Sequence, residues 1–125
     1  MAAKKKSIKI SDKNPDANGL VRILKSNEIN EFIKNNKYVI IDFFATWCPP
    51  CKLMEPITNE LAESFKGKIA FAKINTDLER IAAQEYQIRY VPTFYLFVDG
   101  KIANYFSGAK RKNDFIEIIN KFFKN

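Results

Sequence analysis

Apolar residues in this chain occur in short runs whose spacing changes along the sequence. The stretch 38–45, Tyr-Val-Ile-Ile-Asp-Phe-Phe-Ala, is apolar at nearly every position, which is typical of a strand covered on both faces. Farther on, Met54, Ile57, Leu61 and Phe65 follow a helical period. By the same reasoning we expect strands near residues 20–24, 38–45, 69–74, 93–98 and 102–106, and helices near 26–35, 48–65, 76–86 and 113–124.

The order of these elements predicts the fold class. Strands and helices alternate in the first part of the chain, so those strands should pair in parallel through right-handed crossovers. Asp99-Gly100 predicts a hairpin turn that adds antiparallel strands. We therefore expect an α/β fold with a central mixed β-sheet of about five strands flanked by four helices. We expect this domain to cover residues 20–125, with residues 1–19 as a flexible basic extension.

Composition narrows the function. The chain has 125 residues, enough for one ordinary domain, and no histidine, which excludes Cys–His nucleophiles, Ser–His–Asp triads and the common zinc sites. The formal charge is +7, but most lysines are scattered, so we interpret them as a solvated surface and expect no nucleic-acid partner. No apolar stretch approaches the roughly 18 residues of a membrane span. Neither a membrane anchor nor a signal peptide is expected, and we predict a cytoplasmic location.

Cys48 and Cys51 are the only cysteines, and they stand three residues apart between the apolar stretch 38–45 and a predicted helix. This arrangement is typical of a reversible dithiol–disulfide pair, because the N-terminus of a helix favours a thiolate. A structural cross-link is less favoured, since so small a loop adds little stability. A metal shared between two chains is another reading of the same pair.

The sequence resembles the thioredoxin family over about residues 20–125, and several motifs at matching spacing carry the likeness. They are Trp47-Cys48-Pro49-Pro50-Cys51, Asp42, Pro56, Lys73, Val91-Pro92-Thr93 and Gly108. The resemblance implies the thioredoxin fold and protein-disulfide oxidoreductase activity.

The resemblance also implies catalytic roles. Cys48 would attack a substrate disulfide, and Cys51, expected to be the more buried thiol, would resolve the mixed disulfide. Asp42 interrupts an apolar strand, so we expect a buried carboxylate with a raised pKa. In the family this residue helps to deprotonate the resolving cysteine, and Lys73 would lie near Asp42 and tune its charge.

Six further residues would bind substrate. Trp47 is expected at the surface beside Cys48, and the Val91–Pro92 bond is expected to be cis, leaving the Val91 backbone free to pair with an extended segment. Gly108 would allow close approach. Pro49 and Pro50 lie between the cysteines, and Pro49 replaces the usual glycine. Because these two residues help to set the reduction potential, the motif does not give the direction of exchange.

Three functions fit this sequence. The first is a monomeric thioredoxin without a bound cofactor, which reduces oxidised protein substrates, maintains redox homeostasis and is recharged with electrons from NADPH by a flavoprotein, thioredoxin reductase. The second is an oxidase, an isomerase or a thiol carrier for cytochrome maturation with the same fold. The third is a non-enzymatic binding module.

Overall fold

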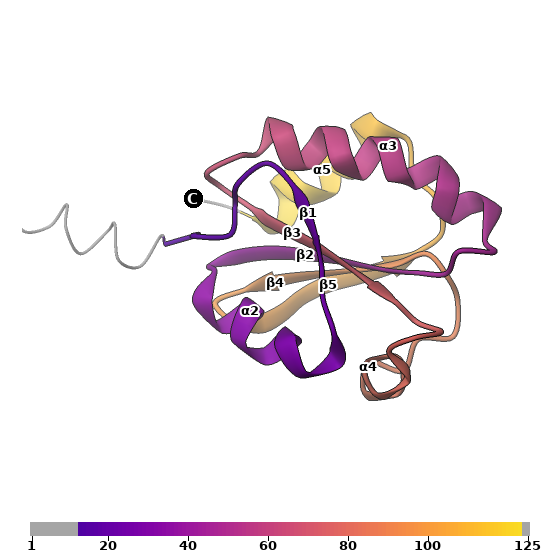
Figure 1. Cartoon of the computed structure of the whole chain (residues 1–125). Helices are drawn as coiled ribbons and strands as arrows, with labels where there is room; N and C mark the ends of the chain where they lie inside the picture. The colour runs from indigo at the N-terminus through magenta and orange to yellow at the C-terminus, as the bar shows by residue number, and fades with distance from the viewer. Residues whose placement is uncertain (1–12, 124–125) are drawn as a thin grey trace, which may run out of the picture.

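The computed structural model describes residues 13–123, and a mixed five-stranded sheet forms its centre (Figure 1). The strand order is β1-β3-β2-β4-β5. β1, β3 and β2 run parallel, while β4 and β5 are antiparallel to their neighbours. The strands are β1 (Val21–Ile23), β2 (Tyr38–Phe44), β3 (Ala70–Asn75), β4 (Thr93–Val98) and β5 (Lys101–Ser107).

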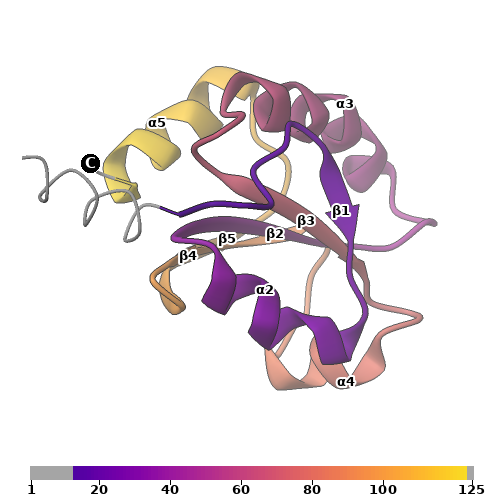
Figure 2. The ribbon, with the colours of Figure 1, turned by 60° about the vertical axis from the view of Figure 1, so that its left-hand side comes forward.

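Within residues 13–123, four α-helices cover the two faces of this sheet, as predicted. Figure 2 shows α3 and α5 on one face and α2 and α4 on the other. The short 3-10 turn η1 (Ser26–Glu28) leads directly into α2. The helices are α2 (Ile29–Asn35), α3 (Pro49–Ser64), α4 (Arg80–Glu85) and α5 (Lys112–Phe122).

The central strand β2 separates two apolar cores. Successive side chains of a strand point to opposite faces, so Val39, Ile41 and Phe43 join the core beneath α2 and α4. Tyr38 and Ile40 join the core beneath α3 and α5. Position 42 continues this second set, and the alternation therefore directs a carboxylate toward the underside of α3.

Helix α4 begins four residues later than predicted. Thr76 and Glu79 have the spacing of a capping box in the sequence, but the Thr76 hydroxyl donates to the Phe44 carbonyl oxygen at 3.2 Å. The Asn75 side-chain oxygen accepts the next two backbone N–H groups. Instead the Ser26 hydroxyl accepts the N–H of Ala82 in the first turn of α4 at 3.1 Å. A residue distant in sequence therefore caps this helix.

The segment 13–19 is attached to the domain rather than separate from it. The Asn36 side chain donates to Asp16 at 2.8 Å, and the Ala17 carbonyl accepts the N–H of Gly67 at 2.8 Å. Ala17 is itself buried. The packed domain thus extends before residue 20, because residues of this segment form hydrogen bonds with the rest of the domain. Residues 1–12 of the predicted extension lie outside the described residues.

Within residues 13–123, none of the helices combines the length and the apolar character that crossing a membrane requires.

Candidate active site around Cys48 and Cys51

The two cysteines form a disulfide at the beginning of α3, with their Cα atoms 5.2 Å apart. Cys48 is the N-cap residue, and its Sγ accepts the N–H of Cys51 at 3.1 Å. The first four N–H positions of a helix lack helical partners. Pro49 and Pro50 remove two of these donors, since proline has none and suits the first turn. The remaining donors and the helix dipole stabilise negative charge on the Cys48 sulfur.

Both cysteines are buried, with Cys48 2% and Cys51 6% exposed. The expectation that Cys51 is the more buried residue is therefore wrong for the disulfide form. The burial of Cys48 results from its packing with Ala45, Phe44 and Val91. Its Sγ lies 3.6 Å from the Val91 carbonyl oxygen.

The segment beside the disulfide has the predicted backbone. The Val91–Pro92 peptide bond is cis, and the Pro92 carbonyl accepts the N–H of Gly108 at 2.8 Å. Gly108 has a φ of +96°, a region that favours glycine, and no atom lies within 4 Å of the place a Cβ would take. Among the residues that the structure describes, the Val91 N–H has no hydrogen-bond partner. An extended segment can approach this backbone.

Trp47 lies at the surface beside the disulfide, as expected, with 67% of the residue exposed. Its indole N–H donates to the Asp77 carboxylate at 2.8 Å. Asp77 belongs to the loop between β3 and α4 and was not predicted as a site residue. No local signal identifies it, because its partner lies thirty positions earlier in the sequence. This hydrogen bond joins the loop that precedes Cys48 to the loop between β3 and α4.

Asp42 is buried beneath α3, as expected, and is 6% exposed. Its Oδ1 has no hydrogen-bond partner among the described residues. Burial raises the pKa of Asp42 from 3.8 to about 7, while the nearby Lys73 opposes and Glu55 adds to this rise. A carboxyl group with such a pKa exchanges its proton near neutral pH.

Asp42 and Cys51 line the same cavity of about 160 Å³, several times the roughly 30 Å³ that one water molecule occupies in the liquid. Lys73 also lines it and pairs in register with Asp42 across the sheet. Lys73 lies within β3, which continues to Asn75. Its ammonium lies 3.4 Å from the carboxylate of Glu55. Glu55 was not predicted, although it follows Cys51 by one helical turn, a spacing visible in the sequence.

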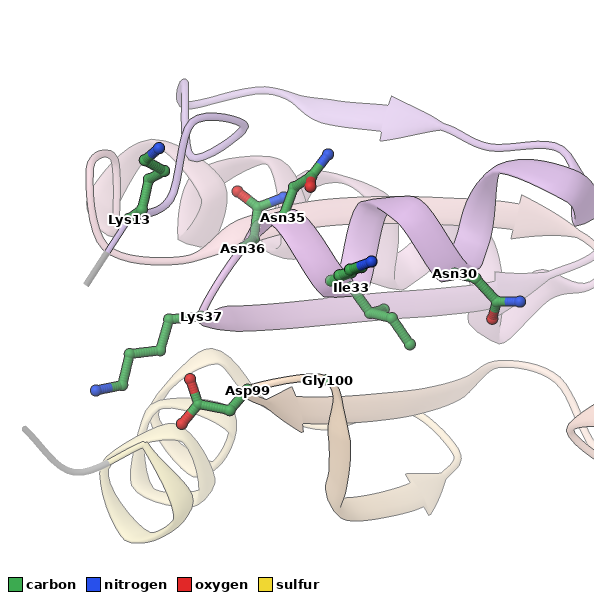
Figure 3. Close-up of a pocket in the computed structure, with 9 residues that line it drawn as sticks. Lys13, Asn30, Ile33, Asn35, Asn36, Lys37, Asp99 and Gly100 are labelled. Carbon is green, nitrogen blue, oxygen red and sulfur yellow. The ribbon is translucent and has the colours of Figure 1, made fainter. Parts of the chain in front are cut away.

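A larger hollow of about 580 Å³ lies elsewhere, around the end of α2 and the β4–β5 turn (Figure 3). Lys37 and Asp99 are among its lining residues. Lys37 directly precedes β2, whereas Cys48 follows the other end of that strand, so roughly 20 Å of extended chain separates the two regions. The hollow belongs to a different part of the molecule from the disulfide.

The residue types at the disulfide fit thiol chemistry. The arrangement provides a sulfur at a helix N-terminus, a second sulfur beside it and a buried carboxyl group that exchanges protons near neutrality. In the described part of the chain, no three His, Cys, Asp or Glu side chains are grouped so that they could hold a metal ion. Fold and site together provide the groups that a protein of the dithiol–disulfide exchange class requires.

Comparisons with known proteins agree with this class. Residues 20–121 match the family model described as Thioredoxin. The chain is 37% identical over 97 residues to a thioredoxin of Mycoplasmoides gallisepticum, covering 78% of this chain and 96% of the relative. It is 46% identical over 103 residues to the chloroplastic thioredoxin Y2 of Arabidopsis thaliana, covering 79% of this chain and 62% of the relative. The chain belongs to the thioredoxin family.

The same assignment follows from solved structures. A mutant thioredoxin of Halobacterium salinarum superposes with a TM-score of 0.79 at 30% identity, covering 86% of this chain and 94% of that one. Among the relatives compared by sequence, this chain spans 62% of the length of the chloroplastic thioredoxin Y2 of Arabidopsis thaliana. It spans 65% of the length of the chloroplastic M-type thioredoxin of Brassica napus. The predicted thioredoxin fold is confirmed.

Proposed function

We propose that this chain reduces disulfides in other proteins by dithiol–disulfide exchange. The observation that carries the proposal is the Cys48–Cys51 disulfide at the N-terminus of α3, with the Val91 carbonyl 3.6 Å from the Cys48 sulfur. A substrate segment that extends along Val91 brings its own disulfide to Cys48. Trp47 and Gly108 border this approach.

The exchange proceeds in two steps. The Cys48 thiolate attacks one sulfur of the substrate disulfide, which forms a mixed disulfide and releases the other substrate sulfur as a thiolate. The Cys51 thiol then transfers its proton to Asp42 through the shared cavity, and its thiolate attacks Cys48. The second substrate sulfur leaves, and the Cys48–Cys51 disulfide forms. The two substrate thiolates take up protons from solvent, so that the substrate gains two electrons and two protons in total, and Asp42 returns the Cys51 proton to solvent.

A reductant must then restore the dithiol. We assign this step to thioredoxin reductase, a flavoprotein that draws on NADPH, so that this chain itself binds no cofactor. The proposal places a monomer in a reducing cytoplasm, where it maintains redox homeostasis. Its support is the family membership and the chemistry of Cys48 and Cys51.

The decisive experiment measures NADPH oxidation with a thioredoxin reductase and a disulfide-bonded protein substrate. Turnover with the wild-type chain and none with Cys48→Ser supports the proposal. The reduction potential then gives the direction of exchange. A value of about −270 mV fits a reductant, whereas about −180 mV or higher fits an isomerase or oxidase and rejects the proposed direction.

A further inference from the structure

Glu55 stands at the entrance of the cavity that contains Asp42, and the proposed exchange does not use it. It follows Cys51 by four residues, so both lie on one face of α3. Its Oε2 is 3.4 Å from the Lys73 Nζ. The Glu55 side chain is 58% exposed and that of Lys73 only 22%. The ion pair therefore has its carboxylate on the solvent side of the cavity and its ammonium on the more buried side.

Lys73 pairs in register with Asp42 on the neighbouring strand, yet its ammonium is held elsewhere. The Lys73 Nζ contacts Glu55 and lies 5.3 Å from the centre of the Phe44 ring. The Asp42 Oδ1 meanwhile lacks a hydrogen-bond partner among the described residues. The cation best placed to stabilise an ionised Asp42 is thus engaged by a different carboxylate.

Titratable and charged side chains near Asp42 come from α3 and β3. Helix α3 contributes Cys51, Lys52 and Glu55 to the cavity, and β3 contributes Lys73. On the other side β4 places Phe94 opposite Asp42, which carries no charge. Lys73 lowers the pKa of Asp42, and Glu55 raises it. Glu55 therefore raises the pKa of Asp42 in two ways: through its own negative charge, and by holding the Lys73 ammonium, which would otherwise lower that pKa further.

We propose that Glu55 is a positioning residue for the resolving step: by holding the Lys73 ammonium at the mouth of the cavity, it keeps Asp42 able to accept and return a proton near neutral pH. The inference rests on the proposed function, in which Asp42 serves Cys51. It differs from a merely structural role, because an exposed ion pair contributes little to stability.

The test follows the titration of Asp42 in the disulfide form by NMR of its carboxyl carbon. Glu55→Gln keeps the shape of the side chain and removes its charge. We expect the midpoint to fall by about half a pH unit or more, because one raising charge is lost and Lys73 is released. An unchanged or higher midpoint overturns the proposal.

Glu60→Gln is the matched control. Glu60 lies on the same helix, is 59% exposed and pairs with Lys112 at 3.3 Å, but it does not line the cavity. It should leave the Asp42 midpoint within about 0.2 units of wild type, as expected for a screened surface charge. A shift as large as that of Glu55→Gln means that general surface charge is responsible, which also overturns the proposal.

A double variant tests whether Glu55 acts through Lys73. If it does, Glu55→Gln should shift the Asp42 midpoint less in a Lys73→Met background than in the wild type. An equal shift in both backgrounds rejects the holding role. The titration needs no reductase activity, so the proposed function and the role of Glu55 can fail separately. Absent turnover in the wild type rejects the proposed function. Intact turnover in the wild type, together with an unchanged Asp42 midpoint in Glu55→Gln, rejects only the role of Glu55.

The pH dependence of mixed-disulfide resolution provides a second readout. The midpoint of the resolution rate against pH should fall in Glu55→Gln by the same amount as the Asp42 titration, and Glu60→Gln should leave it in place. A rate profile that does not follow the titration contradicts a positioning role in the resolving step.

Discussion

Replacement of Asp42 by asparagine should stabilise the protein at alkaline pH. Burial raises the pKa of Asp42 from 3.8 to about 7, so the folded state holds its proton more tightly than the unfolded state. The contribution of the protonated Asp42 to the free energy of unfolding is fully present below about pH 3.8 and is lost as the pH rises to about 7. The pKa of Asp42 is about 3 higher in the folded than in the unfolded state, which corresponds to about 4 kcal/mol in the free energy of unfolding, at about 1.36 kcal/mol for each pH unit.

An asparagine side chain carries no charge and has nearly the same shape as an aspartate, so Asp42→Asn avoids this loss. The advantage of the variant in the free energy of unfolding should be under about 1 kcal/mol at pH 4 and about 4 kcal/mol at pH 8. Urea unfolding of both disulfide forms at several pH values measures this difference. If the two stability curves run parallel between pH 4 and pH 8, Asp42 does not ionise at a cost in the folded state, and the reasoning is refuted.

Three further predictions concern other parts of the molecule. Phe115→Ala should lower the free energy of unfolding by about 3–5 kcal/mol, because this fully buried ring packs 5.0 Å from Phe94; a loss under about 1 kcal/mol in urea unfolding would contradict that packing. Ser26→Ala removes the cap of α4 and should cost about 1 kcal/mol by the same assay, with unchanged stability as the contrary result. Cys51→Ser should accumulate a mixed disulfide with substrate on non-reducing gels, since the resolving thiol is gone; rapid release would show that another group resolves it.

Elements with local signals were predicted well from the sequence. The strand 93–98 agrees residue for residue with β4, because an apolar run ends at Asp99-Gly100, where both residues have positive φ. The burial of Asp42 also followed from its apolar neighbours. In each case the information lies within a few positions along the chain.

Features that depend on distant partners were missed. Thr76 has the spacing of a helix cap, but the Phe44 carbonyl, 32 residues earlier, competes for its hydroxyl. Asp77 and Glu55 acquire their roles from Trp47 and Lys73, which only the fold brings near. The burial of Cys48 likewise depends on Val91, 43 residues later. Such side chains look like ordinary surface residues until the tertiary contacts are known.

The prolines at the start of α3 have a consequence for how this family can diversify. Pro49 occupies a helical position whose N–H would have no helical partner, and its side chain faces solvent. A substitution there disturbs neither of the two cores, yet it changes the immediate surroundings of both sulfurs. A substitution at Pro49 can therefore change the reduction potential of the Cys48–Cys51 pair while both cores stay as they are, so the same architecture can serve as a donor or as an acceptor of electrons.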